Sequence, residues 1–141
     1  MLYFYPEDFG ALGNGVNNDC VAIQSAIDKA EENGGGTVVL TSGKTYYSDS
    51  IRMKKNVELH LQKGSRLKAT DNIDGYIRPC NMINDPKTAL IGNPVTGKPS
   101  FVFIYGYEAD GCTISGEGTI DANGHAFVER KDKYYVTGNF Y

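Results

Sequence analysis

Hydrophobic residues follow two different spacings along this chain, and each spacing predicts a different kind of element. In residues 19–32, apolar side chains recur at offsets of three, seven and ten, which places them on one face of an α-helix. They are Cys20, Ile23, Ile27 and Ala30. Residues 17–19 read Asn-Asn-Asp, and these side chains can accept hydrogen bonds from free helix N–H groups. Because an Asn-Gly pair follows at residues 33–34, we predict a helix over residues 19–32.

Elsewhere the spacing is that of short strands. In residues 57–62 apolar and polar side chains alternate, so Val57, Leu59 and Leu61 share one face, which we expect to be the core face. Similar segments, bounded by Gly, Ser, Asn or Lys, predict further strands. The predicted strands are residues 37–40, 45–48, 51–54, 57–62, 66–70, 101–108 and 112–115. On the last segments we predict that Ile114 and Ile120 point inward.

The strand pattern repeats. Residues 57–67 and 112–120 share an arrangement of strand, glycine turn and strand. A unit that cannot bury its own apolar face must stack on a neighbour, which is how solenoids form one continuous core. The predicted helix is a candidate cover for the N-terminal end of such a stack. No equivalent cap is recognisable near residues 139–141, and an open end of stacked strands offers a surface for self-association.

Two motifs carry a resemblance to a known family. Residues 8–15 read Asp-Phe-Gly-Ala-Leu-Gly-Asn-Gly, and residues 116–121 read Gly-Glu-Gly-Thr-Ile-Asp, with Asn-Gly following at 123–124. Together they resemble the polygalacturonases of glycoside hydrolase family 28, over nearly the whole chain except residues 71–100. The resemblance implies an all-β fold, a right-handed single-stranded parallel β-helix with a short N-terminal capping α-helix. It also implies pectin degradation, that is, cleavage of a cell wall polysaccharide.

The pattern and the resemblance together predict the N-terminal portion of one β-helix domain. Residues 1–36 form the cap turn and helix, 37–70 the first coils, 71–100 a long loop and 101–141 further coils, with the C-terminal coils missing from this sequence. The loop contains four prolines and little periodicity. A loop of this length is either one wall of a substrate cleft or a variable surface.

The resemblance implies a full-length enzyme that hydrolyses α-galacturonosyl or related pectic bonds with inversion, without a metal or organic cofactor. Inverting hydrolysis needs two carboxyl groups about 6.5–9.5 Å apart. In the family these groups and their partners come as Asn-Thr-Asp, Asp-Asp, Gly-His-Gly and Arg-x-Lys elements. The first three, which contain the carboxyl groups, do not occur in this sequence, and Arg-x-Lys occurs only at residues 52–54 and 66–68. We therefore expect no catalytic residue here and no activity from this chain alone.

Four individual residues invite a functional interpretation. His125 and Phe127 are the candidates for substrate binding, because an imidazole can donate to a sugar and an aromatic ring can stack on one; the alternative is a solvated loop. Asp121 stands beside a glycine turn and is predicted to accept hydrogen bonds from local N–H groups. His60 is predicted to belong to a polar ladder with Glu58 and Gln62 on a strand surface, with metal binding as the alternative.

Composition narrows the classes of partner. Seventeen glycines, ten tyrosines and no tryptophan suit short strands joined by tight turns. A net charge of −3 gives no basic field for nucleic acid, and no apolar run approaches the roughly 20 residues of a membrane span. The expected partner is therefore a pectic or related polysaccharide or oligosaccharide. Cys20, Cys80 and Cys112 are widely spaced and predicted to be small core residues, with a disulfide as the alternative.

Two questions stay open from the sequence. The first residues lack a basic leader, so the protein either is cytoplasmic or is secreted with its signal peptide absent from this sequence. The competing functions are a non-catalytic glycan-binding or structural β-helix of the tailspike or adhesin type, and a lyase or epimerase on the same scaffold. The sugar, its linkage and endo or exo action are not fixed by these residues.

Overall fold

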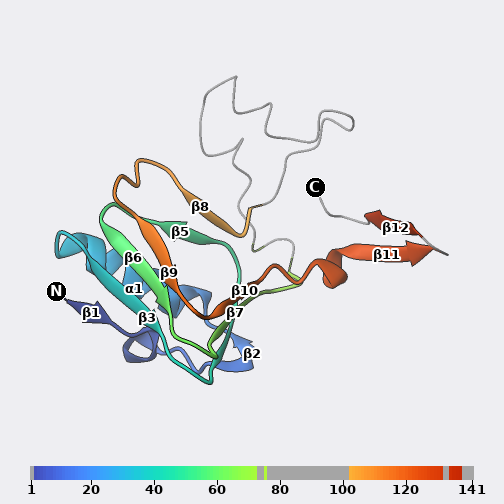
Figure 1. Ribbon diagram of the computed structural model, residues 1–141, viewed down its shortest axis with the longest axis horizontal. Coiled ribbons are helices and arrows are strands. Elements are labelled where there is room, and N and C mark those ends of the chain that lie inside the picture. Colours follow the sequence, from blue (N-terminus) through green and yellow to red (C-terminus); the bar gives the residue numbers. More distant parts are fainter. Residues whose placement is uncertain (1, 73–74, 76–101, 132–133, 138–141) are drawn as a thin grey trace.

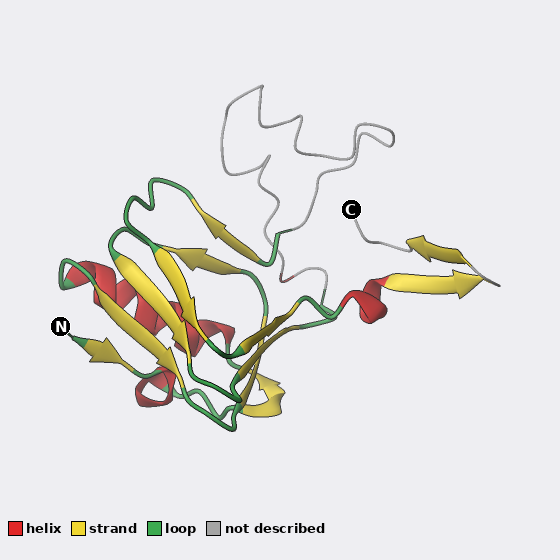
Figure 2. Ribbon diagram, in the orientation of Figure 1, coloured by secondary structure: helices red, strands yellow, loops and turns green. Residues whose placement is uncertain are grey.

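A computed structural model of the chain describes residues 2–72, 75, 102–131 and 134–137. Within these residues most of the regular structure is short strands, together with one α-helix and two short 3-10 turns, as Figure 2 shows by colour. The helix, α1, spans Cys20–Glu32, and the 3-10 turns are η1 (Pro6–Phe9) and η4 (Gly124–Phe127). The strands that matter for the fold form three parallel sheets (Figure 1).

The three sheets are defined by their hydrogen-bonded order. The first sheet contains β1 (Tyr3–Phe4), β3 (Gly36–Leu40), β6 (Val57–Leu61) and β9 (Thr113–Gly116). The second sheet contains β2 (Asn14–Asn18), β4 (Thr45–Ser48), β7 (Arg66–Ala69) and β10 (Thr119–Asp121). The third sheet contains β5 (Ile51–Met53) and β8 (Ile104–Gly106).

From β3 onward the chain visits these sheets in a fixed rotation. The strands β3, β4 and β5 belong to the first, second and third sheets in turn, and β6, β7 and β8 repeat the same order. A third circuit begins with β9 and β10, each parallel to its neighbour in the circuit before. Stacked circuits of this kind are a parallel β-helix, which confirms the fold class predicted from the sequence.

The corner between the second and third sheets differs between circuits. In the first circuit only Asp49 and Ser50 separate β4 from β5. In the second circuit β7 ends at Ala69 and β8 begins at Ile104. The predicted long loop, residues 71–100, falls in this corner and, apart from residues 71–72 and 75, lies outside the described residues. The strand that follows the loop, β8, still pairs in register with β5, with Ile104 opposite Ile51.

Inward side chains form ladders that run from circuit to circuit. Val38, Leu59 and Ile114 are in register in the first sheet, and Leu67 and Ile120 are in register in the second. Val38, Leu59 and Leu67 are fully buried. Each such side chain contributes roughly 1.5–3 kcal/mol through the apolar area that it removes from water. The alternation predicted for residues 57–62 is therefore the core alternation, since Val57, Leu59 and Leu61 face inward.

Ile114 and Ile120, on the end strands β9 and β10, are less buried than core residues should be. Ile114 and Ile120 lie on the inward ladders, as predicted, but their side chains are 45 % and 42 % exposed. The reason is their place in the sheets: β9 and β10 are the end strands of the first and second sheets, so no described strand covers them.

Helix α1 packs against β1, β3, β5 and β6 at the N-terminal end of the stack, as predicted for a cap. Its buried face is made of small and branched residues, Ala22, Ile23, Ala26, Ile27 and Ala30. Cys20, which the spacing placed on this face, is only partly buried, and its Sγ donates to the carbonyl oxygen of Ser50 at 3.2 Å. Cys112 is a partly buried free thiol that packs against the core, and Cys80 lies outside the described residues.

The residues before the helix divide their roles differently from the prediction. Asn18 does accept from a free helix N–H, that of Cys20, at 3.0 Å. Asp19 occupies the N-cap position, but its side chain makes no capping hydrogen bond to the helix, which begins one residue later than predicted. Its buried carboxylate instead accepts from the backbone N–H groups of Leu12 and Gly13, both at 3.0 Å. The carboxylate therefore holds the glycine turn of residues 8–15 against the start of the helix.

After η4 the chain forms a hairpin. The strands β11 (Val128–Lys131) and β12 (Tyr134–Thr137) pair antiparallel, and in Figure 1 they extend away from the three sheets.

Candidate functional site

A row of polar side chains crosses the outer face of the first sheet. Glu58 accepts hydrogen bonds from Thr37 Oγ1 at 3.1 Å and from Ser115 Oγ at 2.5 Å. Because the single hydroxyl proton of Ser115 goes to Glu58, the 2.8 Å contact between His60 Nδ1 and Ser115 Oγ has His60 as the donor. Three successive strands are joined in this way. The predicted polar ladder is confirmed for Glu58 and His60, whereas Gln62 accepts from the N–H of Ser42 at 3.0 Å.

The hydrogen bonds and charges of this row keep the Glu58 carboxyl group ionised. The hydrogen bond from Ser115 is the main cause that lowers the pKa of Glu58, and Thr37 and the charge of His60 act in the same direction. Partial desolvation opposes them without reversing the shift. Glu58 is therefore an ionised acceptor at neutral pH, which is unsuited to protonating a leaving group.

The second family motif ends in a structural turn. Asp121 Oδ1 accepts from the N–H of Asn123 at 2.8 Å, as predicted for a carboxylate beside a glycine turn. Its Oδ2 pairs with Arg66 Nη1 at 3.2 Å, which links β10 to β7. Asn123 adopts a positive φ of 52° and donates from Nδ2 to the carbonyl of Ala69 at 3.0 Å. Oδ2 of Asp121 and the side chain of Asn123 thus hold the third circuit onto the second, while Oδ1 closes the local turn.

The two candidate sugar contacts, His125 and Phe127, lie on η4, directly after this turn. The structure describes their backbone, so their role in binding stays a prediction.

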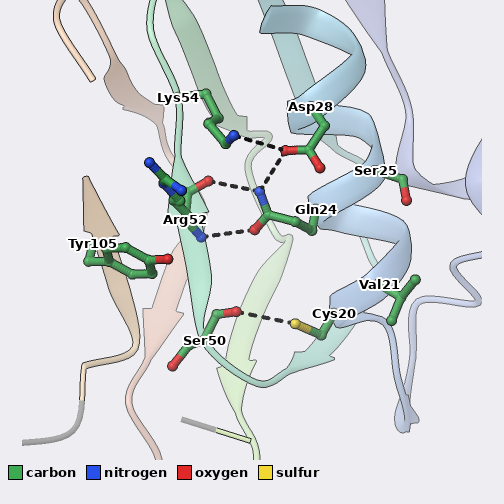
Figure 3. Close-up of a pocket in the computed structure, with 9 residues that line it drawn as sticks. All are labelled: Cys20, Val21, Gln24, Ser25, Asp28, Ser50, Arg52, Lys54 and Tyr105. Atoms are coloured by element: carbon green, nitrogen blue, oxygen red, sulfur yellow. Dashed lines mark hydrogen bonds and ion pairs between the residues drawn. The ribbon is translucent and has the colours of Figure 1, made fainter. Parts of the chain in front are cut away.

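A groove lies between helix α1 and the third sheet, and we call it the helix groove (Figure 3). Its volume is about 500 Å³, and nine residues line it: Cys20, Val21, Gln24, Ser25, Asp28, Ser50, Arg52, Lys54 and Tyr105. Gln24 fixes the backbone of Arg52 from both sides, since Oε1 accepts from the N–H at 2.9 Å and Nε2 donates to the carbonyl at 3.0 Å. Gln24 Nε2 also donates to Asp28 Oδ1 at 3.0 Å.

The charges of the helix groove are unequally compensated. Lys54 lies 3.4 Å from a carboxylate oxygen of Glu31 and 3.8 Å from one of Asp28. Within the described part of the chain, Arg52 takes part in no ion pair, and its buried Nε has no hydrogen-bond partner. Tyr105 on β8 pairs in register with Arg52 on β5. Burial raises the pKa of Tyr105, so its phenol stays protonated at neutral pH.

Sequence reasoning missed the helix groove. Its walls come from residues 20–28, 50–54 and 105, which no local pattern brings together. One signal was present: Arg52 stands between Ile51 and Met53, two apolar residues of a predicted strand, and alternation then turns its side chain outward.

The described residues contain no group of three or more His, Cys, Asp or Glu side chains arranged to hold a metal ion. None of their helices is long and apolar enough to cross a membrane.

Comparison with known proteins places the whole chain in context. A family model described as rhamnogalacturonase A/epimerase, pectate lyase-like matches residues 7–102. Depolymerase 1 of Klebsiella phage KN3-1, specific for capsule KN3, is 31 % identical over 148 residues, which cover 99 % of this chain and 19 % of the phage protein. A mannuronan C5-epimerase of Azotobacter vinelandii is 63 % identical over 38 residues, covering 27 % of this chain and 4 % of the epimerase.

Among solved structures, the family 28 exopolygalacturonase of Yersinia enterocolitica is similar, with a TM-score of 0.66 and 26 % identity. The match covers 86 % of this chain and 21 % of the exopolygalacturonase. The likeness confirms the right-handed parallel β-helix and the resemblance to polygalacturonase-like proteins. The chain spans about a fifth of the length of both the phage depolymerase and the exopolygalacturonase.

Proposed function

Because this chain belongs to the rhamnogalacturonase A/epimerase, pectate lyase-like family, we propose that it is the N-terminal part of a polysaccharide-cleaving glycoside hydrolase. The proposed reaction is hydrolysis of α-galacturonosyl or related pectic bonds with inversion. The observation that carries the proposal is the set of stacked circuits that this chain shares, over 86 % of its length, with a family 28 exopolygalacturonase. In this proposal the division into cap, first coils, long loop and further coils stands as predicted.

The described carboxylates support a scaffold role for this part of the protein. Inversion requires one protonated carboxyl group and one carboxylate that activates water. Glu58 is held ionised, and both oxygens of Asp121 are engaged in local bonds. We therefore assign the reactive pair to residues beyond this sequence, on later circuits.

A second candidate function is epimerisation or lysis of a uronate polymer. It is favoured by the segment that is 63 % identical to a mannuronan C5-epimerase, and by the family itself, which is described as including epimerases. These reactions remove the proton at C5 of the uronate. An epimerase returns a proton from the other face, whereas a lyase expels the neighbouring glycosidic oxygen and leaves a double bond.

One product analysis separates these functions. The complete protein that contains these residues is incubated with polygalacturonate, rhamnogalacturonan and polymannuronate. New reducing ends with saturated, inverted products support the hydrolase, and an unsaturated uronate identifies a lyase. A change of C5 configuration without chain cleavage identifies an epimerase. Binding of the polymer without any chemical change identifies a glycan-binding β-helix and refutes the enzyme proposal.

His125 and Phe127 are part of the proposal as sugar contacts. If they bind substrate, His125→Ala and Phe127→Ala in the complete protein should raise KM and leave kcat near the parent value. Parent-like KM in both variants would remove these two residues from the binding surface.

A further inference from the structure

We propose that the helix groove binds the carboxylate of an acidic sugar on the guanidinium of Arg52, with the sugar ring against Tyr105. This site lies on the third sheet, away from the polar row of the first sheet and the Asp121 turn of the second. It goes beyond the proposed function, because it applies to a hydrolase, a lyase or an epimerase of uronate polymers alike.

The position of Arg52 is set by the fold. Ile51 and Met53 on either side of it are buried in the core, which turns the Arg52 side chain to the outer face of β5. Two hydrogen bonds with the side chain of Gln24 of helix α1, one accepted and one donated by Gln24, hold the same residue by its backbone. In Figure 3 Arg52 lies between Gln24 and Tyr105. Because the backbone of Arg52 and the outward direction of its side chain are set before a ligand arrives, less conformational freedom is lost on binding.

The charge of Arg52 is available to a ligand. Its Nε is buried without an acceptor, and an unsatisfied buried donor is costly, more so when it carries a charge. The other cation of the groove, Lys54, is balanced by Glu31 and Asp28. A carboxylate in the groove could instead pair with the two Nη groups of the guanidinium, and two parallel N–H···O bonds would fix its orientation.

The remaining walls favour a sugar acid over a small inorganic anion. A volume of about 500 Å³ lies within the range of small-molecule sites and is far larger than phosphate requires. Tyr105, in register with Arg52, offers a ring face and a protonated hydroxyl donor. Asp28 disfavours a dianion in the same groove, while its carboxylate can accept from a sugar hydroxyl.

The test uses the full 141-residue chain, digalacturonate as the probe, and neutral digalactose and inorganic phosphate as comparisons. Isothermal titration measures affinity for the parent, for Arg52→Met and for the control Arg66→Met, which removes an arginine paired with Asp121 outside the groove. We expect the parent to bind digalacturonate, Arg52→Met to lose about tenfold or more in affinity, and Arg66→Met to retain it.

A second readout needs no variant and covers the case in which Arg52→Met does not fold. The side-chain amide of Gln24 and the ring of Tyr105 should shift in NMR spectra as digalacturonate is added. Failure of these resonances to move refutes the proposal, as does binding that survives Arg52→Met. Equal affinity for phosphate or for digalactose also overturns it, because the site would then select neither a sugar nor a carboxylate.

Discussion

The inward ladder of the first sheet offers a matched pair of substitutions, Leu59→Ala and Ile114→Ala. The two residues are neighbours in register, but Leu59 is fully buried whereas Ile114 is 45 % exposed. Each change removes three carbon atoms, worth about 2.4 kcal/mol when fully buried at about 0.8 kcal/mol per carbon. At Leu59 a closed cavity adds to this loss, so about 3–4 kcal/mol is expected. At Ile114 roughly half of the area term applies and no cavity closes, so about 1.3 kcal/mol is expected.

Urea unfolding of the parent and both variants measures the difference. All three curves should share one slope, with the midpoint of Leu59→Ala lowered about two to three times as much as that of Ile114→Ala. The comparison is made at two protein concentrations, because a second copy packed on the open end would bury Ile114 and raise its cost. Equal losses of stability for the two variants in a monomeric chain would refute the inference that Ile114 is partly exposed because no strand covers β9.

Three further predictions concern single residues. Hydrogen bonds lower the pKa of Glu58 in the folded state, so the stability that ionised Glu58 contributes is present above the ordinary glutamate pKa and is lost as pH falls through the lowered pKa. A plot of the urea midpoint against pH should therefore be flatter for Glu58→Gln than for the parent, and identical plots would contradict the expected effect. Gly116 has a φ of 102° and its added Cβ would strike the backbone carbonyl of Leu61, so Gly116→Ala should cost about 2 kcal/mol or more, whereas Gly124→Ala, which meets nothing within 4 Å, should cost far less. The 141-residue chain should release no reducing ends from polygalacturonate, and turnover that Asp121→Asn abolishes would overturn its assignment as a structural residue.

Local spacing predicted the helix and the strands β3 to β9, because each of them carries its own signal, whereas β1, β2, β11 and β12 were not predicted. The strand at Thr45–Ser48 has the predicted bounds, and the helix differs from its prediction by one residue at its start. The helical spacing of Ile23 and Ile27 and the alternation along Val57–Leu61 both report which face meets the core. That information is local, so it can be read without knowing the neighbours.

Features that depend on residues distant in the sequence were missed, because local spacing holds no information about those partners. Asp19 has the chemistry of a helix cap, but two N–H groups of the glycine turn, brought close by the fold, take its carboxylate. The helix groove requires α1, β5 and β8 to meet, and only the register of the third sheet makes Tyr105 a neighbour of Arg52. The exposure of Ile114 depends on what lies beyond β9, which no spacing within the strand encodes.

The two versions of the corner between the second and third sheets have a consequence for engineering. Two residues turn it in one circuit, while in the next the chain departs after Ala69 and returns at Ile104 opposite Ile51. Alignment is carried by the rungs themselves, so the length of the connecting segment is free to vary. A binding peptide or a small reporter domain could therefore be placed in the corner between β7 and β8 without shifting the side chains that the rungs keep in line, whereas the shorter corner is fixed by the buried Ser50 and its bond to Cys20.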